Sequence, residues 1–123
     1  MIRIVGVQRS ESTDREFIVV QNQGNMRINL RGHALVADSA VDEPAGLQQA
    51  FVLADDIDIP PGFYAVIRTG SGQPGWCHKH DGYHIYYAYL GRCSPIWNCC
   101  SGPIHLLAPQ HTYVERQVEA LKV

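Results

Sequence analysis

The segment Glu16–Asp38 constrains the fold more than any other part of the chain, because short apolar runs alternate there with glycine-marked turns. An acidic residue opens the run Phe17–Val20, whose β-branched members fit a pleated, half-buried strand. The amide-rich stretch Gln21–Asn25 supplies the permissive backbone of a tight turn. Ile28 and Leu30 then alternate with polar residues at period two, as in a strand with one wet face. The segment therefore predicts several short strands joined by turns.

Similar turn signals recur along the whole chain, and helical periodicity is nearly absent. We predict one all-β domain over residues 1–123, folded as an antiparallel β-sandwich. The predicted strands are Ile2–Gln8, Glu16–Gln21, Arg27–Leu30, Ala34–Asp38, Ala50–Leu53, Phe63–Arg68, His84–Tyr89, Ile104–Leu107 and Thr112–Gln117. Gly70–Gly82 is rich in Gly and Pro and is predicted as a long loop, and Asp55–Gly62 as a strand exit into a turn.

The same pattern predicts which side chains face inward. The predicted core positions are Ile4, Phe17, Val19, Leu30, Leu35, Phe51, Ile59, Val66, Trp97, Leu106 and Val114. Each buried side chain of this size contributes roughly 1.5–3 kcal/mol relative to exposure. Trp97 lies next to a turn signal, and we expect it to fill the centre of the core.

Several short motifs follow one another in a fixed order. They are Asn22-Gln23-Gly24, the run from Ile28 to Asp38, Phe51-Val52-Leu53, Ile59-Pro60-Pro61-Gly62, Thr69-Gly70-Ser71-Gly72, Ile96-Trp97-Asn98 and the closing run Ile104–Leu107. In this order they resemble the lamin tail domain, an immunoglobulin-like sandwich found in nuclear lamins and, in stand-alone form, in many bacterial proteins. The resemblance extends from about Ile2 to Val118, with departures at His33, where members usually carry tryptophan, and at Asp38, which lies one residue late. It implies an immunoglobulin-like fold and a binding or scaffolding module that is not an enzyme.

The charge balance argues against one class of partner. The net charge is -2 and the pI is near 6.3, so a broad electrostatic grip on nucleic acid or anionic lipid is not favoured. Eight of the ten basic residues are arginines, which suit directed contacts with carboxylates or phosphates. We therefore expect a protein partner, and an exposed edge strand that pairs with a second copy would give a homodimer.

The sequence also bears on location. Its start, Met1–Val7, is too short and too punctuated for a signal peptide. No apolar run approaches the roughly 20 residues that a membrane span requires. We expect a soluble, cytoplasmic protein if the chain is complete, whereas a fragment of a secreted protein could come from another compartment.

Cysteines and histidines gather in the second half of the chain, and the resemblance does not explain them. Zinc takes such residues as tetrahedral ligands in short-spaced pairs. The candidate metal ligands are Cys77, His80, Cys93 and Cys99, in a C-x2-H and C-x5-C arrangement. We expect no cofactor, and a zinc-binding or zinc-stabilised domain is the alternative to an interaction module.

Other interpretations of these residues stay open. The cysteines are expected first as free thiols and next as a disulfide that joins Cys77 or Cys93 to Cys99 or Cys100. A cysteine nucleophile with a histidine base can be drawn, but no orienting group or oxyanion site accompanies it. Asp55, Asp56 and Asp58 lack the spacing of a calcium loop and are better explained as a solvated strand exit.

Aromatic residues mark the candidate contact surface, Gly70–Tyr89. Tyrosine combines apolar area with a polar tip, which favours it at interfaces. In a strand, Tyr87 and Tyr89 share one face with Ile85, whereas Tyr86 lies on the other. The predicted binding residues are Trp76, His78, His80, Tyr83 and Tyr86.

Overall fold

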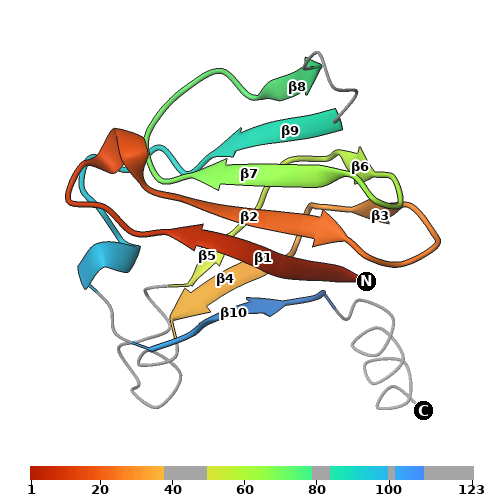
Figure 1. The fold of residues 1–123 in the computed structure, drawn as a ribbon, viewed down its shortest axis with the longest axis horizontal. Helices are drawn as coiled ribbons and strands as arrows, with labels where there is room; N and C mark the ends of the chain where they lie inside the picture. Colours follow the sequence, from red (N-terminus) through yellow and green to blue (C-terminus); the bar gives the residue numbers. More distant parts are fainter. Residues whose placement is uncertain (38–49, 79–83, 100–101, 110–123) are drawn as a thin grey trace, which may run out of the picture.

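The computed structural model describes residues 1–37, 50–78, 84–99 and 102–109, and this part contains ten short strands and two 3-10 turns (Figure 1). The strands are β1 (Ile2–Gln8), β2 (Phe17–Asn22), β3 (Ile28–Asn29), β4 (Ala34–Ala37), β5 (Phe51–Val52), β6 (Asp58–Ile59), β7 (Tyr64–Arg68), β8 (Gly75–His78), β9 (His84–Tyr89) and β10 (Ile104–Leu107). The turns are η1 (Thr13–Arg15) and η3 (Trp97–Cys99). The predicted all-β class is confirmed. Within the described residues, no helix has the length and apolar character needed to cross a membrane.

The strands form two layers. The large sheet contains five strands in the order β1-β2-β7-β9-β8. Opposite it lie the three-stranded sheet β10-β4-β5 and the two-stranded ladder β3-β6 (Figure 1). We call the face of the large sheet that points toward these strands its inner face, and the opposite face its outer face.

One pairing in the large sheet differs from the predicted antiparallel sandwich. β7 and β9 run parallel, in a register that places Tyr64 beside Ile85 and Arg68 beside Tyr89. The chain leaves β7, passes the end of β9 to reach the edge position as β8, and returns between them as β9. Two reversals of direction make β9 parallel to β7. Local sequence patterns report strands but not their order, so this pairing was not predictable from them.

Two segments predicted as irregular contain strands. Gly70–Gly82 was expected to be one long loop, yet β8 lies within it and pairs regularly with β9, Trp76 opposite Tyr86. The Gly and Pro signals are concentrated before β8, in residues 70–74. Likewise β6 lies within the predicted strand exit and pairs with β3, Ile28 opposite Ile59. Both strands are short and flanked by turn residues, which hid them from the period-two pattern.

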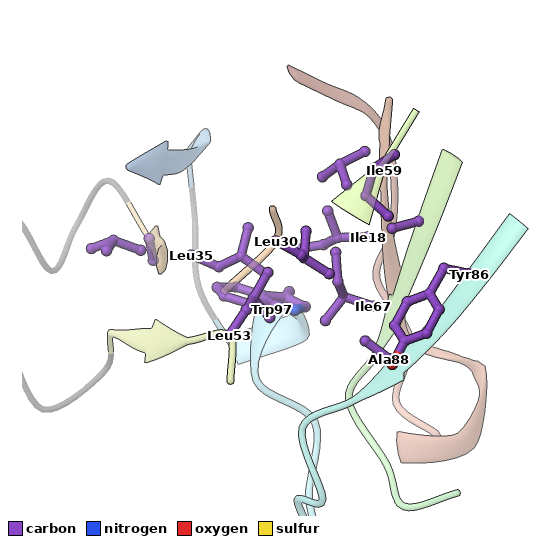
Figure 2. Packing of buried hydrophobic residues seen from close by; sticks show 13 residues of the cluster. Ile18, Leu30, Leu35, Leu53, Ile59, Ile67, Tyr86, Ala88 and Trp97 are labelled. Carbon is purple, nitrogen blue, oxygen red and sulfur yellow. The ribbon is translucent and has the colours of Figure 1, made fainter. Parts of the chain in front are cut away.

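The hydrophobic core lies between the two layers and surrounds Trp97, which is fully buried (Figure 2). Phe51 meets the Trp97 ring edge-on, with ring centroids 5.6 Å apart. The predictions of Leu30, Leu35, Ile59 and Trp97 as core residues are confirmed. Val114 and the predicted strand Thr112–Gln117 lie outside the described residues, as does Asp38.

The prediction for β2 chose the wrong face. Phe17 and Val19 were expected to point inward, but Ile18 and Val20 are the buried residues of this strand. Val66 pairs with Val19 and shares its outer face, although its side chain is nearly covered. A run of four apolar residues carries no alternation, so it cannot show which face of the strand is buried.

Two fully buried polar side chains lie at the ends of β2. At the start, the Glu16 carboxylate accepts hydrogen bonds from the backbone N–H groups of Ile96 (2.7 Å), Trp97 (3.0 Å) and Asn98 (2.9 Å), and from the Thr69 hydroxyl (2.8 Å). These bonds hold η3 against the large sheet and position Trp97 in the core.

At the other end of β2, the Asn22 side chain organises the turn that follows. Its amide donates to the carbonyl oxygens of Met26 (2.7 Å) and Ile59 (2.8 Å), and its oxygen accepts from the Gly24 N–H (3.0 Å). The asparagine of the N-x-G motif thus satisfies buried backbone groups that the chain reversal leaves without strand partners.

Candidate functional site

The outer face of the large sheet carries a band of half-buried aromatic and aliphatic side chains. Strand register brings them together in rows from β2 through β7 and β9 to β8: Phe17 with Arg68 and Tyr89, Val19 with Val66, Tyr87 and Gly75, and Tyr64 with Ile85 and Cys77. No other strand of the described residues packs on this face (Figure 1). Aromatic area of this kind is typical of contact surfaces.

Arg68 lies in the middle of this face, between two rings. Its guanidinium carbon is 5.6 Å from the ring centroid of Phe17 and 5.6 Å from that of Tyr87. One guanidinium nitrogen donates to the Asp14 backbone oxygen at 3.2 Å. Within the described part of the chain, no carboxylate forms an ion pair with Arg68. The side chain is therefore held in place while most of its donors remain available.

A groove runs beside Arg68 toward the β8 edge. We call it the outer groove, and its lining residues are Asp14, Arg68, Ser71, Gln73, Pro74, Gly75, Trp76, Cys77, Tyr87 and Tyr89. The loop of residues 70–74 forms one wall, and a Cβ at Gly72 would overlap the Tyr89 ring. By contrast, a Cβ at Gly75 would meet nothing within 4 Å. The groove thus has a closely packed wall at Gly72 and open space at Gly75.

The rings of Trp76 and Tyr86 point to the inner face of the sheet, although Trp76, on the edge strand, also contributes to the lining of the groove. The Trp76 ring meets the Tyr86 ring (centroids 5.4 Å apart) and the Phe63 ring (6.0 Å), and Phe63 stacks on His84 at 4.5 Å. These residues form an aromatic cluster on the inner face, at the β8 end. Trp76 remains 36% exposed.

The prediction that Tyr86 is a binding residue is wrong, because this residue is buried. Only 5% of the side chain is exposed, and its hydroxyl donates to Asp55 Oδ2 at 2.5 Å. Burial raises the pKa of the Tyr86 phenol, and the Asp55 carboxylate raises it further. Tyr86 is therefore a core residue that ties β9 to the segment before β6. The predicted alternation is confirmed, since Tyr87 and Tyr89 point outward.

The remaining predicted binding residues are only partly described. His78 ends β8, where it pairs with His84. His80 and Tyr83 lie outside the described residues. Of the predicted contact surface Gly70–Tyr89, the groove contains Trp76, Tyr87 and Tyr89, and the structure adds Arg68 and Asp14 to them.

The structure separates two of the four candidate metal ligands. Cys77 pairs with Ile85 near the beginning of β9, whereas Cys93 follows the other end of that strand. The path from Ile85 to Tyr89 alone covers about 13 Å at the usual rise of a strand. Zinc–sulfur bonds are about 2.3 Å long, so these two thiols do not share an ion. Both are free thiols.

No metal-binding group of three His, Cys, Asp or Glu side chains occurs among the described residues. Of the other two candidate ligands, His80 and the side chain of Cys99 lie outside the described part, so zinc binding stays a prediction. The acidic residues after β5 have a structural partner instead. Asn29 Nδ2 donates to Asp56 Oδ1 (2.7 Å) and Asp58 Oδ1 (3.1 Å), which joins β3 to this segment.

Comparison of the chain with protein-family models, curated proteins and solved structures finds no match. The resemblance to the lamin tail domain therefore stays a prediction, carried by the motifs of the sequence. Among those motifs, Asn22 and Trp97 have clear structural roles, in the turn after β2 and at the centre of the core.

Proposed function

We propose that the chain is a non-enzymatic interaction module with an immunoglobulin-like fold, as its resemblance to the lamin tail domain implies, and that it binds a protein through the outer groove. The observation that carries this proposal is the Arg68 guanidinium, held between Phe17 and Tyr87 without a carboxylate partner in the described structure. Arginine and tyrosine are enriched at protein interfaces, and both are fixed here before a partner arrives.

The chemistry of the groove indicates what the partner presents. Arg68 suits a carboxylate, which its planar fork binds through two hydrogen bonds. Tyr87 and Tyr89 offer aromatic surface next to it, and Gly75 leaves room for a side chain between Tyr87 and the sheet edge. We therefore propose an acidic side chain beside an apolar one as the matching element. Because Arg68 and Tyr89 are already packed, binding costs little of the side-chain entropy that a mobile surface would lose.

The test compares two groove variants with a control on the other layer. Arg68→Gln removes the charge, Tyr87→Ser removes the ring, and Leu107→Ser changes an exposed apolar residue of β10. Wild-type and variant proteins are immobilised, exposed to an extract of the cells that make the protein, and compared by quantitative mass spectrometry. A protein that depends on the groove is then purified and titrated by calorimetry.

We expect both groove variants to weaken binding by about tenfold or more, which corresponds to at least about 1.4 kcal/mol, and Leu107→Ser to bind like the wild type. Binding that is equal for wild-type, Arg68→Gln and Tyr87→Ser proteins would rule out the outer groove as the site.

A further inference from the structure

The two edges of the large sheet differ in how they are protected. At β1, the register with β2 shifts between Ile4 and Gly6, so Val5 forms a bulge, and Arg3 adds a charge. Bulges and charges are the usual devices that prevent another strand from pairing with an edge. The β1 edge therefore has two of them.

The β8 edge has none of these devices. Gly75 to His78 pair with β9 in an unbroken register, and these four residues include no proline, Lys, Arg, Asp or Glu. Within the described residues, β9 is the only strand that pairs with β8. The outward N–H and C=O groups of β8 are thus available to pair with another strand.

We propose that β8 pairs in antiparallel fashion with β8 of a second copy, so that the two large sheets become one continuous sheet. The proposal is independent of the partner assigned to the outer groove. We choose a second copy as the partner because the β8 edge is open and the β1 edge is blocked. In the large sheets, pairing through the open edges leaves only the bulged β1 edges free, so growth of this sheet stops at a closed two-fold dimer rather than a fibre.

The side chains of β8 fit this arrangement. A two-fold axis perpendicular to a sheet places residues of the same face opposite one another. With the axis at Trp76, the two Trp76 rings meet on the inner face, where each is still 36% exposed. On the outer face, Gly75 lies opposite the second copy's Cys77. A Cβ at Gly75 would have nothing within 4 Å, so this space accommodates the thiol-bearing side chain.

The first experiment measures mass in solution by analytical ultracentrifugation over a range of protein concentrations. We expect the wild type to be a concentration-dependent dimer and Trp76→Lys, which places two charges opposite each other, to raise the dimer dissociation constant at least about tenfold. Val5→Lys, at the 45% exposed bulge of β1, is the matched control and should keep the dimer. Circular dichroism establishes that each variant is folded before its mass is interpreted.

A second experiment tests the register. In Gly75→Cys, mild oxidation should link the new thiol to the second copy's Cys77 and produce a covalent dimer, whereas the double variant Gly75→Cys, Cys77→Ser should not form this link. A wild type that stays monomeric at the highest attainable concentration would overturn the proposal. So would a dimer that Trp76→Lys leaves intact, or one in which no such link forms. Arg68→Gln should keep the dimer, so the experiments can reject the proposed groove binding without rejecting the proposed pairing of β8 edges, and the reverse.

Discussion

Two regions of the molecule differ in how far their polar groups are buried and hydrogen-bonded: the contact of β2 with η3, and the β7–β9–β8 part of the large sheet. At the first, the Glu16 carboxylate is fully buried and both of its oxygens accept hydrogen bonds. At the second, Arg68 is half-exposed and Trp76 partly so, and the β8 backbone has a strand partner on one side only within the described residues. Buried and satisfied groups stabilise a fold, whereas positioned groups with unused capacity are suited to recognition. The first region therefore serves stability, and the second carries the binding that we propose.

The ionisation of Glu16 supports this division. Burial by itself would raise the pKa of the carboxyl group, because the charged form loses water. The backbone N–H groups of Trp97, Ile96 and Asn98, together with the Thr69 hydroxyl, outweigh burial and lower the pKa below its ordinary value of 4.5. The carboxylate is thus ionised at neutral pH and anchors η3.

The largest expected effect comes from removing this anchor. Glu16→Ala leaves three backbone N–H groups near the core without an acceptor, and we expect it to lower the free energy of unfolding by about 3–5 kcal/mol. Glu11→Ala, at an exposed position in the preceding loop, is the control and should change it by less than about 0.5 kcal/mol. Urea titration followed by tryptophan fluorescence measures both. Equal stability of the two variants would refute the anchoring role.

Acid should weaken the same anchor. The pKa of Glu16 is lower in the folded protein than in the unfolded chain, so its contribution is complete above the unfolded value of 4.5 and is lost as pH falls through the lower folded value. We therefore expect the free energy of unfolding to decline below about pH 4.5, and to decline less steeply in Glu16→Gln. Urea titrations at a series of pH values measure this difference. Identical slopes in the two proteins would show that another group controls acid unfolding.

A smaller change in the free energy of unfolding is expected for substitutions in β9. Tyr86→Phe removes the hydrogen bond to Asp55 and should cost about 1 kcal/mol, because the aromatic packing is retained. Tyr87→Phe changes the neighbouring, outward-facing residue, and we expect almost no loss of stability. Thermal unfolding of both variants measures the difference. A larger loss in Tyr87→Phe would mean that the faces of β9 are exchanged.

The boundaries of several strands were predictable from the sequence. β1, β9 and β10 have the predicted limits, and Trp97 occupies the predicted core position. β8 was not predictable, because its four residues follow a segment dominated by Gly and Pro signals. Its pairing with β9 requires contact between separate segments, which local periodicity does not report.

Part of the candidate site was predictable from the alternation of residues within a single strand. The alternation of tyrosines in β9 indicated that Tyr87 and Tyr89 share a face, and this is confirmed. The position of Arg68 between Phe17 and Tyr87 depends on the strand order β2-β7-β9 and on the parallel register of β7 and β9. A lone arginine at the end of an apolar strand gives no signal of such an arrangement. The role of Glu16 was also not predictable from the sequence, because its backbone donors come from residues 96–98, far away along the chain.

The separation of stability from recognition is tested most directly by one crossed comparison of Glu16→Gln and Gly75→Lys, in which the free energy of unfolding and the solution mass are both measured. A Cβ at Gly75 has open space, so we expect Gly75→Lys to keep the wild-type stability within about 0.5 kcal/mol. It should weaken the dimer, because a lysine on an edge strand opposes pairing with another strand. Glu16→Gln should do the reverse, losing stability but keeping the dimer under conditions in which it is folded. The account would be contradicted if Gly75→Lys unfolded the protein or left the dimer intact, or if Glu16→Gln dissociated the dimer while remaining folded.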